Sequence, residues 1–160
     1  MPSTIDIVHV VDIDTTPQRL YEAITTLEGL ASWWTPQAKA RPRVGAVIEV
    51  TFGQLSTLAF KVERLKPARF VDWAAVRVPP AWEGTCVTWD ITQNEGSVSL
   101  RFSHTGFSPT YTEFGAFSYF WAQYLRSLKV YLETGEGEPF GSAGSIAAGT
   151  TPRRMMASAG

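Results

Sequence analysis

The chain has 160 residues, of which 44% are hydrophobic and 18% are charged. This length and balance favour one folded domain with a single core. A formal net charge of -1 argues against a strongly basic nucleic-acid-binding protein, and a single cysteine, Cys86, excludes an internal disulfide. No stretch approaches the roughly 18 apolar residues of a membrane-spanning helix, and the N-terminus lacks the basic region of a signal peptide. We therefore expect a cytoplasmic protein without a membrane span.

The first third of the chain predicts a strand followed by two helices. Residues 4–14 alternate in a way typical of a strand. The segment TTPQRLYEAITTLEG predicts a helix with Thr16 as its cap, Pro17 at its first position and Gly29 at its end. A second short helix is expected from Leu30 to Trp34, ending before Pro36.

The middle of the chain predicts a loop and then a series of strands. The segment TPQAKARPRVG reads as a loop with three basic residues, Lys39, Arg41 and Arg43. Five strand-like segments follow, at 46–52, 57–65, 69–78, 85–93 and 97–105. Their short connections predict an antiparallel meander, in which the NEG turn is the clearest hairpin.

The last third predicts a long helix and a tail. After Thr110 large apolar residues recur at helical spacing, which predicts a helix of about six turns that ends near Gly135. Residues 137–160 are rich in Gly, Ser and Ala and have no period, so we expect a flexible tail there, after a domain spanning 1–136.

Together these elements predict an α+β fold, with about six antiparallel strands packed against the long C-terminal helix. Four segments occur in an order that resembles a known family: PQRLYEAITTLEGLASWWTP, PPAWEGTCVTWDI, LRFSHTGF and WAQYLRSLKVYLETGEGEP. They are similar to homologues of the heat-shock-protein-90 ATPase activator, in the START-like (SRPBCC) superfamily. The resemblance implies the helix-grip fold, in which a curved sheet wraps around the long helix.

The resemblance also implies a function. START-like proteins share an internal hydrophobic cavity that binds lipids, polyketides, hormones or aromatic molecules, so we expect a small hydrophobic ligand and no cofactor. Two alternatives stay open: an interaction module that acts on a chaperone or a transcription regulator, and, ranked last, a cyclase- or hydrolase-like enzyme. A homodimer is also left open. The family name alone does not imply a chaperone partner, because most bacterial members look like single small domains.

The candidate cavity residues lie on the inward faces of the strands and of the long helix, and the alternative for each is plain core packing. We expect Trp34 to be anchored in the core, Trp33 to lie nearer an opening, and Tyr111 to stand at the start of the long helix near the mouth. The full set is Trp33, Trp34, Phe52, Phe60, Trp89, Phe102, His104, Tyr111, Phe117, Trp121 and Tyr124.

His104 is the main polar candidate. It either bonds a ligand or acts as an acid or base near neutral pH, or its ring bonds a backbone group and closes the end of the sheet. No phosphate-binding, zinc-protease or nucleophile-elbow motif occurs, and two histidines with one cysteine make a zinc site improbable. We therefore name no catalytic residue and no metal ligand.

Three further features have interpretations, and the first two have two each. The basic loop residues Lys39, Arg41 and Arg43 either steer an anionic ligand or are simply solvated. Trp82 lies in a turn, where it caps the cavity or forms a dimer contact. Asp72 is expected to face solvent on the outer side of the sheet.

Overall fold

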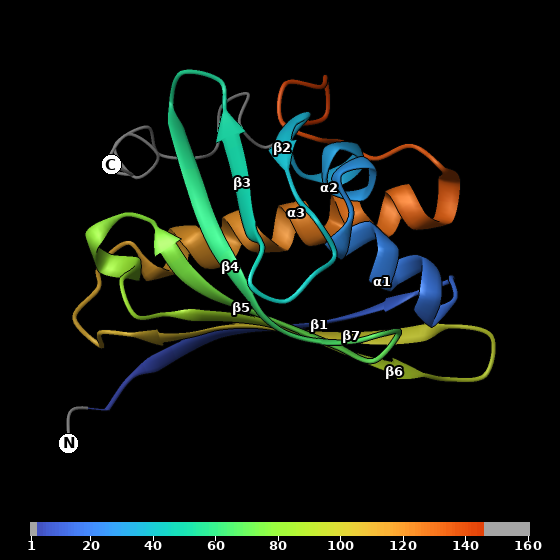
Figure 1. Ribbon diagram of the computed structural model, residues 1–160, viewed down its shortest axis with the longest axis horizontal. Helices are drawn as coiled ribbons and strands as arrows, with labels where there is room; N and C mark the ends of the chain where they lie inside the picture. Colours follow the sequence, from blue (N-terminus) through green and yellow to red (C-terminus); the bar gives the residue numbers. More distant parts are fainter. Residues whose placement is uncertain (1–2, 146–160) are drawn as a thin grey trace.

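The structure is a computed structural model that describes residues 3–145. The long helix α3 lies along one face of a curved sheet, and two short helices cover one end of that face (Figure 1). The elements in chain order are β1 (Ile5–Ile13), α1 (Pro17–Thr25), α2 (Leu27–Trp33), β2 (Gln37–Lys39), β3 (Val47–Phe52), β4 (Ser56–Lys66), β5 (Phe70–Arg77), a 3-10 turn η1 (Pro80–Trp82), β6 (Cys86–Gln93), β7 (Val98–Phe107) and α3 (Phe114–Thr134).

The sheet is the predicted antiparallel meander, closed at one side by the first strand. The strand order is β1-β7-β6-β5-β4-β3-β2, so β1 pairs with β7, the last strand along the chain. The sequence predicted about six strands, and the additional one is β2, which we had assigned to a loop. β2 has only three residues, which is too short for an alternating pattern, and it is held by pairing with β3.

The boundary between the two short helices lies at a different residue from the one expected. Helix α1 ends at Thr25 rather than at Gly29, because Thr26 is extended and caps both helices. The Thr26 hydroxyl donates to the Glu22 carbonyl and accepts the Gly29 N–H at 3.1 Å. Gly29 therefore lies inside α2, where an added Cβ would stand 2.5 Å from Ala23 Cα. The predicted helix end is wrong, because glycine serves here for close packing of α2 on α1.

Other local predictions are confirmed. Thr16 caps α1, with its hydroxyl accepting the Arg19 N–H at 3.2 Å, and Pro17 is the first helical residue. Helix α3 ends at Gly135, which adopts a left-handed conformation with a φ of 91°. The turn between β6 and β7 is closed by the Asn94 N–H, which donates to the Ser97 carbonyl at 2.9 Å.

Residues 137–145, at the start of the expected tail, turn back over α2 toward the tip of β3 (Figure 1). The Phe140 N–H donates to the Trp34 carbonyl at 2.8 Å, and the Phe140 ring packs edge-on against Phe52 at 5.5 Å. The Glu138 N–H donates to the buried Ser127 hydroxyl at 2.8 Å, and its carboxylate pairs with Arg126. These contacts attach 137–145 to the domain. The remaining residues of the expected tail, 146–160, lie outside the described residues.

None of the helices in the described part of the chain has the length and apolar character needed to cross a membrane.

Candidate functional site

The interior between the sheet and α3 is lined by large aromatic side chains. Inward faces of β3, β4, β6 and β7 bury the apolar residues that alternation predicted, and α3 contributes its apolar stripe. The structure brings ten of the eleven predicted cavity residues together, each with at most 2% of its surface exposed: Trp33, Trp34, Phe52, Phe60, Trp89, Phe102, His104, Phe117, Trp121 and Tyr124.

Tyr111 is the exception. Helix α3 begins three residues later than we expected, so Tyr111 lies in the turn before it, with its N–H donating to the Ser108 carbonyl. The Tyr111 side chain is half-buried and stacks on Phe107, with ring centroids 5.6 Å apart. Its hydroxyl accepts the Trp82 indole N–H at 3.4 Å, and burial raises its pKa.

Trp34 stands at the centre of the aromatic interior. Its ring stacks on Trp33, with centroids 5.5 Å apart and planes within 4°, and lies nearly parallel to Trp73 at 6.1 Å. It also contacts Trp121 at 5.2 Å. The assignment of the adjacent tryptophans is thus revised. Both are fully buried, and Trp33 is the one fixed by a hydrogen bond, from its indole N–H to the Ala23 carbonyl at 2.8 Å.

Three of the six indole N–H groups are buried without a hydrogen-bond partner among the described residues. These belong to Trp34, Trp73 and Trp89, whose side chains are completely buried. Trp73 contacts Trp89 at 5.2 Å, so the three rings form one continuous cluster with Trp34. We call Trp34, Trp73 and Trp89 the open-donor cluster. A buried N–H without an acceptor costs about 1–3 kcal/mol, and folded proteins satisfy most such groups.

Trp73 is the member of this cluster that the predicted site residues omitted. It lies on β5, where Val71 and Trp73 are both fully buried while their neighbour Asp72 pairs with Arg64. The alternation in the segment FVDW would have placed Trp73 inward. Asp72, between these two buried residues, lies on the outer side of the sheet as expected.

Both ring nitrogens of His104 have partners, and their roles follow from the donors around them. The Trp121 indole N–H donates to His104 Nδ1 at 3.1 Å, so Nδ1 carries no proton. In the neutral ring the proton is then on Nε2, which donates to the Thr85 hydroxyl at 2.9 Å. Thr85 in turn donates to the Trp82 carbonyl. This chain of hydrogen bonds links α3, β7 and the turn that contains η1.

The electrostatics of the interior favour neutral groups. Burial lowers the pKa of His104 to about 3, so its ring is uncharged at neutral pH. Burial raises the pKa of Tyr124 to about 12, an effect partly offset by a hydrogen bond with Ser145. Among the described residues, no Asp, Glu, Lys or Arg is buried.

Three other residues with polar or reactive side chains, Trp82, His9 and Cys86, pack within the domain. Trp82 is fully buried and packs edge-on against Phe117 at 4.4 Å, so it is not an exposed dimer contact. His9 is half-buried, with its Nε2 3.1 Å from the Ser118 carbonyl of α3. Cys86 is half-buried, and burial raises the pKa of its thiol.

Comparison with known proteins agrees with this geometry. Residues 14–133 match the model of the family described as activator of Hsp90 ATPase homolog 1-like protein. The chain belongs to this family. The Aha1 dimer from Colwellia psychrerythraea is similar in structure, with a TM-score of 0.77 and 32% identity over 83% of this chain and 99% of that one.

More distant structures share the fold. SSP2350 from Staphylococcus saprophyticus has a TM-score of 0.71 and 19% identity, covering 83% of this chain and 95% of that chain. DynU16, from the dynemicin biosynthetic locus, has a TM-score of 0.69 and 22% identity, covering 82% of this chain and 48% of that one. A search of curated proteins finds no match. The predicted helix-grip fold and START-like family are thus confirmed.

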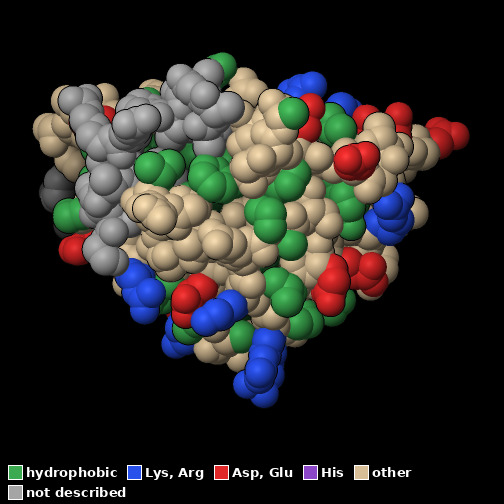
Figure 2. Space-filling view, turned by 90° about the horizontal axis from the view of Figure 1, so that it is seen from above, with side chains coloured by type: hydrophobic (Ala, Val, Ile, Leu, Met, Phe, Trp, Pro, Cys, Tyr) green, Lys and Arg blue, Asp and Glu red, His purple; other side chains and the backbone are tan. Residues whose placement is uncertain are grey.

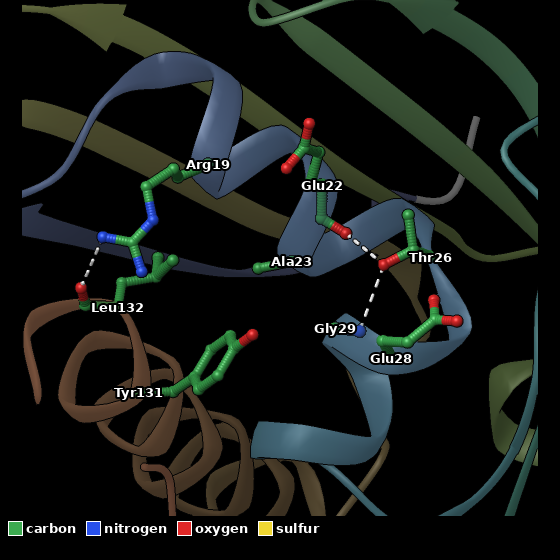
Figure 3. A pocket seen from close by; sticks show the side chains of 8 residues that line it. All are labelled: Arg19, Glu22, Ala23, Thr26, Glu28, Gly29, Tyr131 and Leu132. Atoms are coloured by element: carbon green, nitrogen blue, oxygen red, sulfur yellow. Dashed lines mark hydrogen bonds between the residues drawn. The ribbon is translucent and has the colours of Figure 1, made fainter. Parts of the chain in front are cut away.

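The surface of residues 3–145 also carries pockets outside the aromatic interior, of which two bear on the function. One, of about 350 Å³, is bounded by α1, α2 and the end of α3 (Figure 3). Its polar groups mostly bond to one another: the Arg19 guanidinium donates to the Leu132 carbonyl at 3.2 Å, and Thr26 bonds to Glu22 and Gly29. We therefore interpret this pocket as the packing interface between the three helices and not as a ligand site.

The second pocket, of about 450 Å³, lies at the basic loop after β2. On the face shown in Figure 2, hydrophobic side chains are interspersed with acidic and basic ones. Among the described residues on this face there is no large exposed apolar patch of the kind that the interaction-module alternative requires.

Proposed function

We propose that this protein binds a small, neutral, largely apolar molecule that carries a hydrogen-bond-accepting oxygen, in the interior between the sheet and α3. The observation that carries this proposal is the open-donor cluster, in which the indole N–H groups of Trp34, Trp73 and Trp89 are buried without acceptors. A carbonyl or ether oxygen among these rings would satisfy donors that are otherwise costly.

The shape and charge of the interior define the class of molecule. Its side chains are aromatic rings in direct contact, with centroids of neighbouring rings in the cluster 5.2 to 6.1 Å apart, so the ligand we propose is an apolar or flat body that enters by separating these rings. Since no charged side chain is buried among the described residues, an ionised ligand would have no counter-charge. The family resemblance, which implies ligand binding in this interior, supports the same proposal.

Acid–base catalysis is less well supported by the geometry. A catalytic histidine near neutral pH needs a pKa near that pH and a free nitrogen that reaches the substrate. The pKa of His104 is about 3, and both of its ring nitrogens are hydrogen-bonded within the domain. Thr85, which accepts the hydrogen bond from His104, donates its own hydroxyl proton to a backbone carbonyl and is not activated as a nucleophile.

The binding proposal is tested with two probes that differ in one acceptor, 2-acetylnaphthalene and 2-ethylnaphthalene. Isothermal titration calorimetry should show the acetyl compound binding about tenfold more tightly, equivalent to about 1.4 kcal/mol for one net hydrogen bond. Trp73→Phe, which removes an unpaired donor, should reduce this preference. Trp33→Phe is the matched control, because the Trp33 N–H is already bonded to Ala23.

Equal affinity of the two probes in the wild-type protein would overturn the role of the open-donor cluster. Absence of binding by both probes would overturn ligand binding of this class. Loss of the acetyl preference in Trp33→Phe as well as in Trp73→Phe would assign the preference to general packing.

We also propose that two copies associate through β1. The similar protein from Colwellia psychrerythraea is a dimer, and β1 is an edge strand of the sheet. Val10 and Val8 on its outer face are 63% and 41% exposed, and edge strands pair readily with a second chain. Light scattering should give twice the chain mass for the wild type and the single mass for Val10→Lys. A wild-type monomer at high concentration would contradict this.

A further inference from the structure

The pocket at the basic loop has a composition unlike that of the interior. It lies between the start of α2, the end of β2 and the start of β3, and has a volume of about 450 Å³. Its lining contains three cations and four apolar residues but no acidic residue: Leu27, Lys39, Ala40, Arg41, Arg43, Ala46 and Val47.

The three cations of this pocket are not neutralised within the domain. Lys39, Arg41 and Arg43 are exposed, and in the described part of the chain none of them forms an ion pair. Lys61 adds a fourth cation nearby, because it lies opposite Val47 in the β3–β4 register. Two acidic residues lie beside these lining residues: Glu49, opposite Lys39 in the β2–β3 register, and Glu28, next to Leu27 in α2. The positive charge around the pocket therefore exceeds the negative charge.

The apolar residues of the pocket are exposed to an unusual degree. Leu27 is 41% exposed and Val47 is 46% exposed, and Val44, next to the pocket in the same loop, is 57% exposed. Single exposed apolar residues are common, but three that surround a cationic pocket offer a surface for an apolar chain next to a site for an anion.

From this juxtaposition we propose a second binding site, distinct from the aromatic interior, for a small anionic amphiphile. Arg41 and Arg43, with Lys39, bind the carboxylate, and Leu27 and Val47 contact the hydrocarbon body. The ligand class is a free carboxylate with a short alkyl chain. It differs in charge from the neutral molecule proposed for the interior, so each site is testable without the other.

The test is a titration of the uniformly ¹⁵N-labelled protein with sodium octanoate below its micellar range, followed by backbone amide shifts. We expect saturable shifts centred on residues 27 and 39–47, and much smaller shifts with 1-octanol or sodium propionate, which each lack one half of the chemistry. The double variant Arg41→Glu, Arg43→Glu should weaken octanoate binding about tenfold or more, equivalent to about 1.4 kcal/mol. The matched control is Lys66→Glu, Arg69→Glu on the β4–β5 turn, which makes the same change in net charge outside the pocket.

The two double variants distinguish a specific site from a general charge effect. Loss of binding in the pocket variant but not in the control supports the site, and a smaller loss with Leu27→Gln supports its apolar half. Equal weakening in both double variants would show a general charge effect and overturn the proposal. Shifts confined to interior residues would place octanoate in the aromatic interior and overturn it as well. Equal affinity for octanoate and propionate would show that the alkyl chain makes no contact, and would overturn the assignment of an amphiphile to this site.

Discussion

The hydrogen-bond chain from Trp121 through His104 and Thr85 to the Trp82 carbonyl fixes the tautomer of a buried histidine. Every donor in the chain has an acceptor, so the neutral ring is satisfied where it lies. If His104 were protonated, its Nδ1–H and the Trp121 indole N–H would be two donors that point at each other. Burial of the ring lowers the pKa of His104, and this arrangement of donors leaves its Nδ1 without room for a proton.

The low pKa of His104 makes stability depend on pH. Because the folded-state pKa of about 3 is below the ordinary value of 6.5, the unfolded chain binds more protons than the folded chain between these values. The free energy of unfolding should thus fall as pH drops below 6.5, by about 2 kcal/mol between pH 7 and pH 5. Urea unfolding of His104→Gln, which does not titrate, should show less of this fall. The same fall in wild type and variant would contradict the assignment.

At the element scale, the segment 137–145 closes the end of the interior between α2 and β3. Gly137 passes so close to α2 that an added Cβ would lie 2.5 Å from the Ser32 carbonyl oxygen. Ser127 of α3 then connects two elements, since its hydroxyl donates to the Trp33 carbonyl and accepts the Glu138 N–H. The segment is therefore bound directly to the Trp34 carbonyl and, through the Ser127 hydroxyl, to the Trp33 carbonyl.

Removal of the Phe140 ring should loosen this segment without unfolding the domain. Phe140→Ala loses the edge-on contact with Phe52, and since the ring is only half-buried we expect a cost of about 1–2 kcal/mol, below that of a fully buried phenylalanine. Hydrogen exchange at the Glu138 and Phe140 amides should accelerate, while the amides of the β4–β5 hairpin serve as the internal control. Unchanged exchange at both amides would show that other contacts hold the segment.

At the scale of the whole molecule, most of the fold followed from patterns in the sequence. The alternation of Val98, Leu100, Phe102 and His104 correctly placed one face of β7 inward, because side chains on a strand alternate between its two faces. The helical period after Thr110 located α3, and its end was set by Gly135. Alternation and helical periodicity are local patterns that extend over many residues. They can therefore be recognised without knowing which elements pack against each other.

The features that escaped prediction depend on contacts between distant residues. β2 exists only through its pairing with β3, and the Gly- and Ser-rich composition of 137–145 gave no sign that Phe140 would reach Phe52. Sequence patterns placed Trp33, Trp34 and Trp89 at the site but could not show which indole N–H groups find an acceptor. The Trp33 N–H bonds to a carbonyl of another helix, whereas those of Trp34 and Trp89 do not find a partner among the described residues.

The central claim is that the open-donor cluster receives an acceptor from a bound ligand. Indole N–H resonances in a ¹H–¹⁵N correlation spectrum report directly on this, since all six tryptophans of the chain each contribute one signal. With saturating 2-acetylnaphthalene, the signals of Trp34, Trp73 or Trp89 should move downfield, while those of the bonded Trp33 and Trp121 move little. Downfield shifts of the same size with 2-ethylnaphthalene, or no movement of the three open donors, would contradict the account.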